Sequence, residues 1–207
     1  MSPWFDEVVA IDPDPQMLDV AERSARKQAI TNVRFVNIPA EDLSRDPSPL
    51  RMATFGASFH WTDRMLVANR LFSLLVPGGG LVILAPSGLW RGSERWKQVV
   101  INTLKDWLGE NRLSASGPFR PGPRHEECLA QTAFVDLKVV DIRKVHAWTT
   151  ESLVGYLYST SFASKAVLGP LQEGFERDLR VRLASLQAED ELLEEMEFTI
   201  ISVKKPR

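Results

Sequence analysis

Short apolar runs alternate along the chain with longer segments in which apolar residues recur at helical spacing. The runs are rich in Val, Ile and Phe, as buried strands are, whereas the longer segments place Leu and Val three or four residues apart, as amphipathic helices do. We therefore predict strands near residues 7–11, 33–36, 52–58, 81–85, 135–142 and 196–203. Strands that alternate with helices are typical of an α/β fold with a mainly parallel sheet.

Several helix boundaries are marked by their residues. Asp14 suits the N-cap of a helix that follows the first strand, and Pro15 suits its first position. Thr149 and the two residues after it open a helix in the same way. A helix that follows residue 63 stops at Val76-Pro77-Gly78-Gly79-Gly80, which we interpret as a turn because Pro and Gly interrupt helices.

Polar residues stand at the carboxyl ends of two predicted strands. Asp12 ends the first strand, and His60-Trp61 follows the third. Open α/β sheets bind ligands beyond these ends, and a histidine there has a pKa suited to acid–base work near neutral pH. Two plainer interpretations stay open: Asp12 helps to cap the helix, and His60 packs beside Trp61 and orders the loop.

The residues that follow His60-Trp61 carry a family resemblance. They are an apolar helix with Asn69-Arg70-Leu71, then Leu74-Leu75-Val76-Pro77-Gly78-Gly79, then an apolar strand. This pattern resembles class I S-adenosylmethionine (SAM)-dependent methyltransferases, closest to their type 11 small-molecule branch. The resemblance implies a Rossmann-like fold with an antiparallel last strand, SAM as cofactor, and a small molecule as substrate.

The resemblance also implies a domain layout and a strand order. One domain would span residues 1–207, with a partial Rossmann core in 1–90, a helical cover and the sixth strand in 91–195, and the last strand and tail in 196–207. In the family's numbering the strand order would be third, second, fourth, fifth, seventh, sixth, because the family's first strand has no counterpart here.

Individual residues take roles from the same resemblance. His60 is the catalytic candidate. The cofactor-binding candidates are Asp12 toward the ribose, the Ala40-Glu41 loop toward the adenine edge, and Met17 and Ser58 beside them. Pro39 stands where many members carry a carboxylate, so a backbone contact is expected there; Glu41 could equally be a solvated loop acid. The substrate-binding candidates are Trp61, Tyr156, Tyr158, Ser159 and Ser161.

The family's glycine-rich cofactor turn, with the strand before it and the helix after it, should precede Val8, where too few residues are available. Gly78-Gly79-Gly80 follows a helix and precedes a strand, which is the wrong context for that turn. We therefore expect a form truncated at the N-terminus, with weak or no SAM binding. The alternative is a non-methylating partner subunit or a repurposed small-molecule enzyme. A homodimer or a partner chain could cover the open sheet edge near Val8–Ile11 and Thr54–Ser58.

Composition bears on which partners and which cellular location we expect. The chain has 207 residues, a net charge of −2 and one cysteine. Such a charge gives no indication of nucleic-acid or anionic-membrane binding. No apolar run reaches the roughly 18 residues of a membrane span, and the N-terminus does not resemble a signal peptide. Cys128 cannot form an internal disulfide, so we expect a buried thiol and a cytoplasmic protein.

Overall fold

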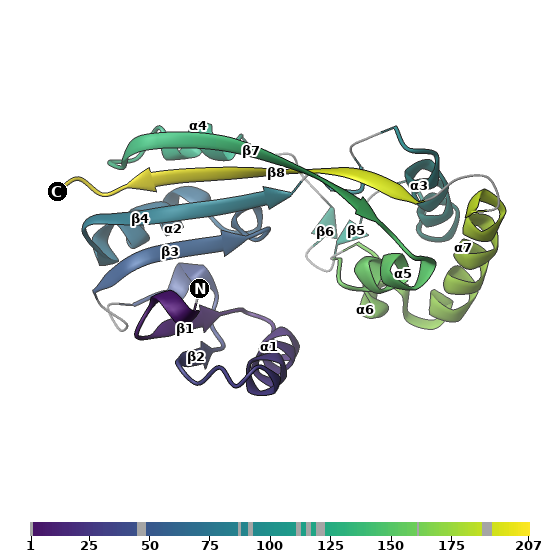
Figure 1. The fold of residues 1–207 in the computed structure, drawn as a ribbon, viewed down its shortest axis with the longest axis horizontal. Helices are drawn as coiled ribbons and strands as arrows, with labels where there is room; N and C mark the ends of the chain where they lie inside the picture. The colour runs from purple at the N-terminus through teal and green to yellow at the C-terminus, as the bar shows by residue number, and fades with distance from the viewer. Residues whose placement is uncertain are drawn as a thin grey trace. The chain divides into compact units, whose positions relative to one another are not determined.

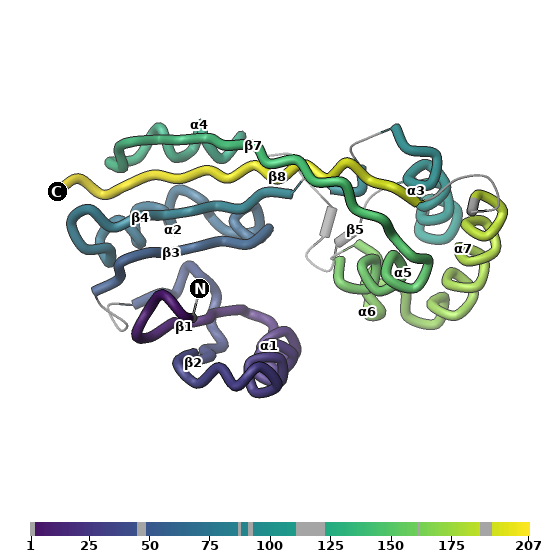
Figure 2. The backbone as a smooth tube through the Cα atoms, in the orientation of Figure 1, coloured from purple at the N-terminus to yellow at the C-terminus, as the bar shows by residue number. Residues whose placement is uncertain are grey.

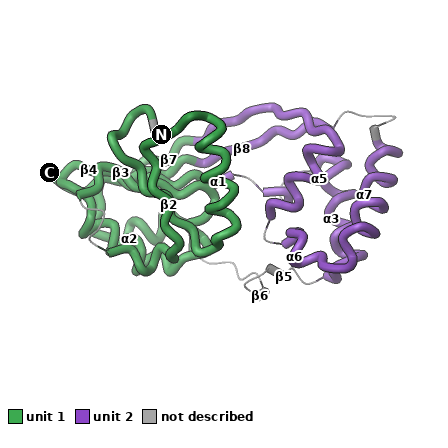
Figure 3. The backbone as a smooth tube through the Cα atoms, turned by 90° about the horizontal axis from the view of Figure 1, so that it is seen from below, with its two compact units in different colours: residues 1–84, 123–140, 200–207 green, residues 85–122, 141–199 purple. Residues whose placement is uncertain are grey.

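The computed structural model describes residues 2–44, 49–86, 88–90, 93–110, 113–114, 117–118, 123–160, 162–187 and 192–207. The chain divides into two compact units (Figure 3). Unit 1 comprises residues 1–84, 123–140 and 200–207, and unit 2 comprises residues 85–122 and 141–199. The long strands β7 (Val135–Ala147) and β8 (Leu193–Lys204) contribute residues to both. The prediction of one domain over the whole chain stays a prediction.

Unit 1 begins with the 3₁₀ turn η1 (Ser2–Trp4) and a βαβ element: β1 (Val8–Ile11), α1 (Pro15–Lys27) and β2 (Val33–Val36). The two strands pair in parallel, from Val8 opposite Val33 to Ile11 opposite Val36. The predicted start of the helix is confirmed, because the Asp14 side chain accepts a hydrogen bond from the backbone N–H of Gln16. The short turn η2 (Ala40–Asp42) follows β2.

A second parallel pair follows in unit 1. It consists of β3 (Leu50–Gly56), the turn η3 (Phe59–Trp61), α2 (Arg64–Leu74) and β4 (Leu75–Pro86). The predicted turn over residues 76–80 is wrong in one respect, because these residues belong to β4. They form an irregularity in it: the register jumps from Leu50 opposite Leu75 to Met52 opposite Gly80. The backbone N–H of Gly78, at φ +77°, donates to the Lys205 carbonyl at 3.0 Å, so the chain's last residues hold this segment.

The predicted strand order is confirmed, with one interruption. β3, β4, β8 and β7 form a four-stranded sheet in that order, and β1 and β2 form a separate two-stranded sheet. The ribbon shows β8 antiparallel to β4 and β7, as expected for the last strand (Figures 1 and 2). The interruption falls between β1 and β3, at the place where the resembling family has its first strand. Among the described residues, β1 is paired on one side only, and so is β3.

The core of unit 1 lies between the β3–β4 pair and the helices that follow. Phe59, Val67 and Leu81 are fully buried there, and Ile11 of β1 packs against the same cluster. The short helix α4 (His125–Leu129) also belongs to unit 1 and contributes the buried Leu129 to this core.

Unit 2 is mainly helical. Its helices are α3 (Arg95–Leu108), α5 (Thr150–Tyr158), α6 (Lys165–Leu168) and α7 (Gln172–Gln187), with the turn η4 (Gly169–Leu171) before α7 and a two-residue hairpin of β5 (Leu113–Ser114) and β6 (Gly117–Pro118). Helices α3 and α7 pack along each other. Their apolar stripes, with Val100, Phe175 and Leu179 fully buried, form a second core that is separate from that of unit 1. Trp96 of α3 is buried in this core, and Trp107 of the same helix packs against it.

Unit 2 also buries an ionic cluster. The Lys97 Nζ atom lies 2.8 Å from Glu194 Oε1 and 3.1 Å from Glu94 Oε1, and the Lys97 side chain is only 2% exposed. The Trp148 indole N–H donates to Glu194 Oε2 at 2.7 Å. A buried lysine without such partners would cost several kcal/mol, in the order of magnitude of ion desolvation, so these carboxylates are a condition for the packing of α3.

Candidate functional site

The carboxyl ends of β1 and β2 place polar groups at one edge, because the two strands are parallel. Asp12 follows β1 directly, and its Oδ1 atom accepts a hydrogen bond from the Asp14 N–H at 2.8 Å. Asn37 follows β2, and its side-chain amide donates to the Asp12 carbonyl at 2.9 Å. The carboxylate of Asp12 is thus held by a turn. It keeps acceptor capacity for a ligand, because an ionised carboxylate has about four acceptor positions.

The loop after β2 is tied to the start of α2. Ala40 is buried, and Glu41 Oε1 accepts a hydrogen bond from the Asp63 N–H at 2.7 Å. Asp63 in turn caps α2 by accepting from the Leu66 N–H at 3.0 Å. The Glu41 side chain therefore has a structural partner at a helix N-terminus, where a negative charge is favourable. The first backbone N–H groups of η2 have no partner inside the turn. They are therefore the groups of this loop that could bind a ligand.

The segment after β3 carries a strained residue. Ala57 has φ +54°, a left-handed conformation that costs a non-glycine residue roughly 1 kcal/mol or more. Its N–H donates to the Leu84 carbonyl at 2.9 Å, which holds it in place. Ser58 follows as an exposed residue at the end of β3. Met17, the remaining cofactor candidate, is 50% exposed on the first turn of α1.

His60 has two aromatic neighbours, Trp61 and His125. Its imidazole lies beside the Trp61 ring, with centroids 4.9 Å apart, and 6.4 Å from the ring of His125. Sequence patterns did not single out His125, which opens α4 far along the chain. Arg64, in the first turn of α2, donates through Nη1 to the Pro123 carbonyl and so fastens α2 to the approach to α4.

The two imidazoles have lowered pKa values. For His60 the causes are, in order, partial burial, the neighbouring His125 and the positive charge of Arg64. For His125 they are burial and Arg64, opposed by Glu126, which raises its pKa. Both rings are therefore neutral at neutral pH and able to accept a proton, which is what a general base requires.

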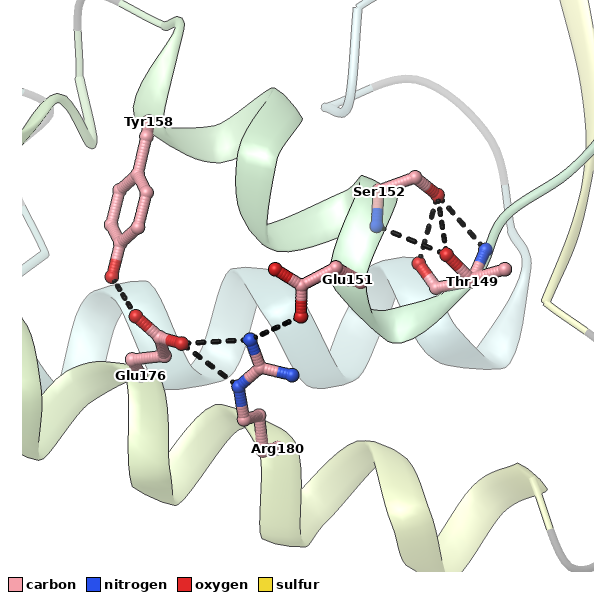
Figure 4. Close-up of polar contacts among 6 residues, drawn as sticks. All are labelled: Thr149, Glu151, Ser152, Tyr158, Glu176 and Arg180. Atoms are coloured by element: carbon pink, nitrogen blue, oxygen red, sulfur yellow. Dashed lines mark hydrogen bonds and ion pairs between the residues drawn. The ribbon is translucent and has the colours of Figure 1, made fainter.

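The predicted substrate residues on α5 belong to unit 2, where each makes a structural contact. The Tyr158 hydroxyl donates to Glu176 of α7, which Arg180 also binds (Figure 4). The Ser159 hydroxyl donates to the Tyr156 carbonyl at 2.6 Å at the end of the helix. The Tyr156 ring packs on Trp148, with centroids 5.2 Å apart.

These tyrosines have raised pKa values. Burial, followed by the hydrogen bond and charge of Glu176, raises the pKa of Tyr158 to about 12. Burial and then Glu194 raise the pKa of Tyr156. Neither hydroxyl therefore ionises near neutral pH. Ser161, the remaining substrate candidate, lies outside the described residues.

The described part of the chain shows neither a metal site nor a membrane-spanning helix. Within residues 2–44, 49–86 and the further described ranges, no group of three His, Cys, Asp or Glu side chains is arranged to hold a metal ion. In the same ranges, no helix combines the length and the apolar character needed to cross a bilayer.

Part of the chain is similar to known methyltransferases. The family model described as "Methyltransferase domain" matches residues 2–79, which include β1, β2, β3 and the loops that end them. Over 81 residues the chain is 32% identical to CRG1 of Saccharomyces cerevisiae, described as a probable S-adenosylmethionine-dependent methyltransferase. In its first part, the chain is similar to SAM-dependent methyltransferases. The match covers 38% of this chain and 28% of CRG1, so the chain spans less than a third of that relative's length.

Solved structures support the fold over the whole chain. A candidate methyltransferase of Bacillus halodurans, BH2331, has a TM-score of 0.58 at 16% identity, covering 100% of this chain and 86% of that one. A Haemonchus contortus phosphoethanolamine N-methyltransferase, solved with phosphomonomethylethanolamine and S-adenosylhomocysteine, has a TM-score of 0.52 at 16% identity. It covers 97% of this chain, and the match spans 44% of that chain. The Rossmann-like class I methyltransferase fold is confirmed. SAM is the cofactor named in the description of CRG1.

Proposed function

We propose that this chain is a SAM-dependent methyltransferase domain of the type 11 small-molecule branch, and that its described residues supply the nucleoside-binding half of the cofactor site. The observation that carries this is Asp12. It is an acid at the carboxyl end of a parallel strand, fixed by a turn and followed by a capped helix. This is the position from which an acidic residue accepts hydrogen bonds from ribose hydroxyls in dinucleotide-type folds.

The neighbouring residues fit the remainder of a nucleoside. Backbone N–H groups of Ala40 and Glu41 are the adenine contacts that we propose, since the Glu41 carboxylate is already engaged by Asp63. Met17 and Ser58, both exposed, would lie against the nucleoside through their side chains. The CRG1 match and the methyltransferase-domain match support the cofactor assignment.

The amino-acid half of SAM has no comparable support among the described residues. The one cluster of glycines there, Gly78 to Gly80, is an irregularity in β4 that pairs with residues near Lys205. A Cβ atom on Gly79 would come within 2.9 Å of the Val76 carbonyl oxygen, so glycine is required there for packing. We therefore propose that the 207-residue polypeptide binds SAM weakly. Losing several charged hydrogen bonds of about 1.5–3 kcal/mol each moves a micromolar site toward the millimolar range.

The one-sided pairing of β1 and β3 suggests how the site could be strengthened. Unpaired strand edges are templates for a further strand. We propose that additional chain, from a second copy or a partner, pairs with β1 or β3. The half-buried residues Val8 to Ile11 and the buried Phe55 would supply its apolar contacts. Cys128 is a free, buried thiol, which fits the cytoplasmic location predicted from cysteine usage.

Methyl transfer requires little of the protein beyond positioning of the two reactants. When bound, SAM supplies an activated methyl group, and holding the acceptor in line with it provides much of the rate effect. His60 is the proposed catalytic residue, as a neutral imidazole able to take a proton from the acceptor. Trp61, Tyr156, Tyr158, Ser159 and Ser161 are proposed substrate contacts. Of these, exposed Trp61 has the best support, because Tyr158 and Ser159 already bind Glu176 and the Tyr156 carbonyl.

Calorimetric titration with SAM tests this proposal. The 207-residue chain should show a dissociation constant near the millimolar range, and a version extended upstream or mixed with a partner chain should bind more tightly. A chain that shows no competition between SAM and adenosine would contradict the nucleoside assignment. The alternative of a non-methylating subunit would be favoured only if the tightly binding form transferred no methyl group to any acceptor.

A further inference from the structure

Three side chains with positive or proton-accepting character gather beyond the end of β3. They come from three elements of unit 1: His60 from η3, Arg64 from the first turn of α2, and His125 from the first turn of α4. The two imidazole rings are 6.4 Å apart, and the Arg64–Pro123 hydrogen bond fixes the arginine next to them. A guanidinium has five N–H donors, so this one bond leaves Arg64 able to bind a ligand as well.

Aromatic rings pack against both imidazoles. The fully buried Phe59 contacts His125 edge-on at 5.4 Å, and Trp61, which is 45% exposed, lies beside His60. The Nδ1 atom of His125 is buried, and no hydrogen-bond partner for it exists among the described residues. A buried, unsatisfied ring nitrogen is costly unless something pairs with it. The cluster thus combines an unpaired polar atom with an aromatic surface, a combination typical of small-molecule sites.

Arg64 is the positive group that acts on both imidazoles. Burial is the first cause that opposes protonation of His60, followed by His125 and Arg64. The carboxylate that acts on His125 is Glu126, which pairs with Arg124 at 3.0 Å. The nearby Asp63 carboxylate caps α2 through the Leu66 N–H. A guanidinium beside two rings with N–H groups can donate several hydrogen bonds to an anionic oxygen, and such charge-assisted bonds are the strong ones.

We propose that His60, Arg64 and His125 bind an anionic oxygen of the small-molecule substrate, either a carboxylate or the oxyanion of an acidic hydroxyl. The proposal rests on the proposed function only in taking this ligand to be the methyl acceptor. With an acidic hydroxyl, the O–H bond breaks, its proton moves to a neutral imidazole nitrogen, and the imidazolium and Arg64 stabilise the oxyanion. With a carboxylate, no proton moves, and Arg64 makes the main contact.

Two aromatic probes distinguish these sources: 4-nitrophenol, whose colour reports its ionisation, and benzoate. The full chain is titrated with each at neutral pH without SAM, and the histidine resonances are followed by NMR. At least one probe should bind saturably, shift the His60 and His125 signals, and raise both pKa values. Bound 4-nitrophenol should also show a larger yellow phenolate fraction than free 4-nitrophenol. Because SAM is omitted, this result does not depend on whether the chain binds its cofactor.

Variants locate the binding. Arg64→Gln should weaken it about tenfold or more, as expected for a charged hydrogen bond, and Arg64→Lys should restore part of the loss. Arg26→Gln, which removes the same charge from an exposed pair with Glu22 on α1, should leave binding unchanged. Should Arg64→Gln fail to fold, His60→Gln on its exposed side chain carries the test and should weaken binding as well. Binding of neither probe, or equal binding by the Arg64 and His60 variants and the native chain, would overturn the proposal.

Discussion

The two units of this protein use their polar residues in opposite ways. In unit 1 the acids and histidines lie at the ends of parallel strands, half-buried or exposed, and their contacts are turns and caps, as at Asp12 and Glu41. In unit 2 one ion pair, Lys97 with Glu194, is buried in the core, and other charged groups pair with each other at the surface, as at Arg143 and Glu197. Binding requires polar groups with spare capacity, whereas a buried ion pair is already satisfied. We therefore propose that ligand binding belongs to unit 1 and that most of the polar residues of unit 2 serve packing.

The largest effect is expected where the charge is most deeply buried. Lys97→Ala leaves Glu194 in the core without its ionic partner and should lower the free energy of unfolding by about 3–5 kcal/mol. Arg143→Ala is the matched control in the same unit, because Arg143 pairs with Glu197 at the surface, with 69% and 38% of the two side chains exposed. It should cost under about 1 kcal/mol. Urea unfolding of both variants checks this, and equal costs would remove the distinction between the two kinds of charge.

A smaller effect is expected in unit 1, and on binding rather than stability. Asp12→Asn should weaken the binding of adenosine by about 1–3 kcal/mol, because it removes a charged acceptor while keeping the turn to the Asp14 N–H. Asp14→Asn is the control, since Asn and Asp cap helices about equally well. Competition titrations measure both. If Asp12→Asn bound adenosine as the native chain does, Asp12 would not belong to the site.

Tyr158 tests whether the predicted substrate residues of unit 2 are structural. Tyr158→Phe removes the hydrogen bond to Glu176 and should cost about 0.5–1.5 kcal/mol below pH 10. The folded-state pKa of Tyr158, about 12, exceeds its ordinary value of 10.0. The stabilisation is therefore complete below pH 10 and is lost as the pH rises toward 12. Unfolding measured at pH 9 and pH 11.5 should show the native chain approaching the variant, and a constant difference would contradict this assignment.

The smallest effect concerns the histidines of unit 1. Their folded-state pKa values lie below the ordinary 6.5, so the neutral rings stabilise the fold above that pH. This contribution is lost as the pH falls below 6.5, because the unfolded chain then binds more protons than the folded chain. His60→Gln with His125→Gln should flatten the pH dependence of the free energy of unfolding between pH 7 and pH 5. An unchanged slope in the double variant would show that the loss comes from other groups.

Local patterns predicted what is local in this protein. The apolar runs predicted where the strands lie, and Asp14 and Pro15 predicted the start of α1. The strand order came from the family resemblance. The sequence missed His125 because a histidine that opens a short helix carries no periodic signal, and its approach to His60 depends on how α4 packs. It also did not predict the pairing of Lys97 with Glu194, which joins a helix to a strand nearly a hundred positions later. The sequence predicts a simple turn at glycines 78–80. Their pairing with the C-terminal residues is a long-range contact, which a local pattern does not reveal.

The central claim is that the described residues of unit 1 recognise the nucleoside part of SAM and little else of it. The most direct test is to measure the affinities of adenosine and of SAM for the same preparation of the 207-residue chain, by competition against one reporter nucleoside. We predict that the two dissociation constants agree within a few-fold, because the amino-acid tail of SAM adds little binding energy. SAM binding a hundredfold tighter than adenosine, which corresponds to roughly 2.7 kcal/mol, would contradict the claim and show that this chain holds both ends of the cofactor.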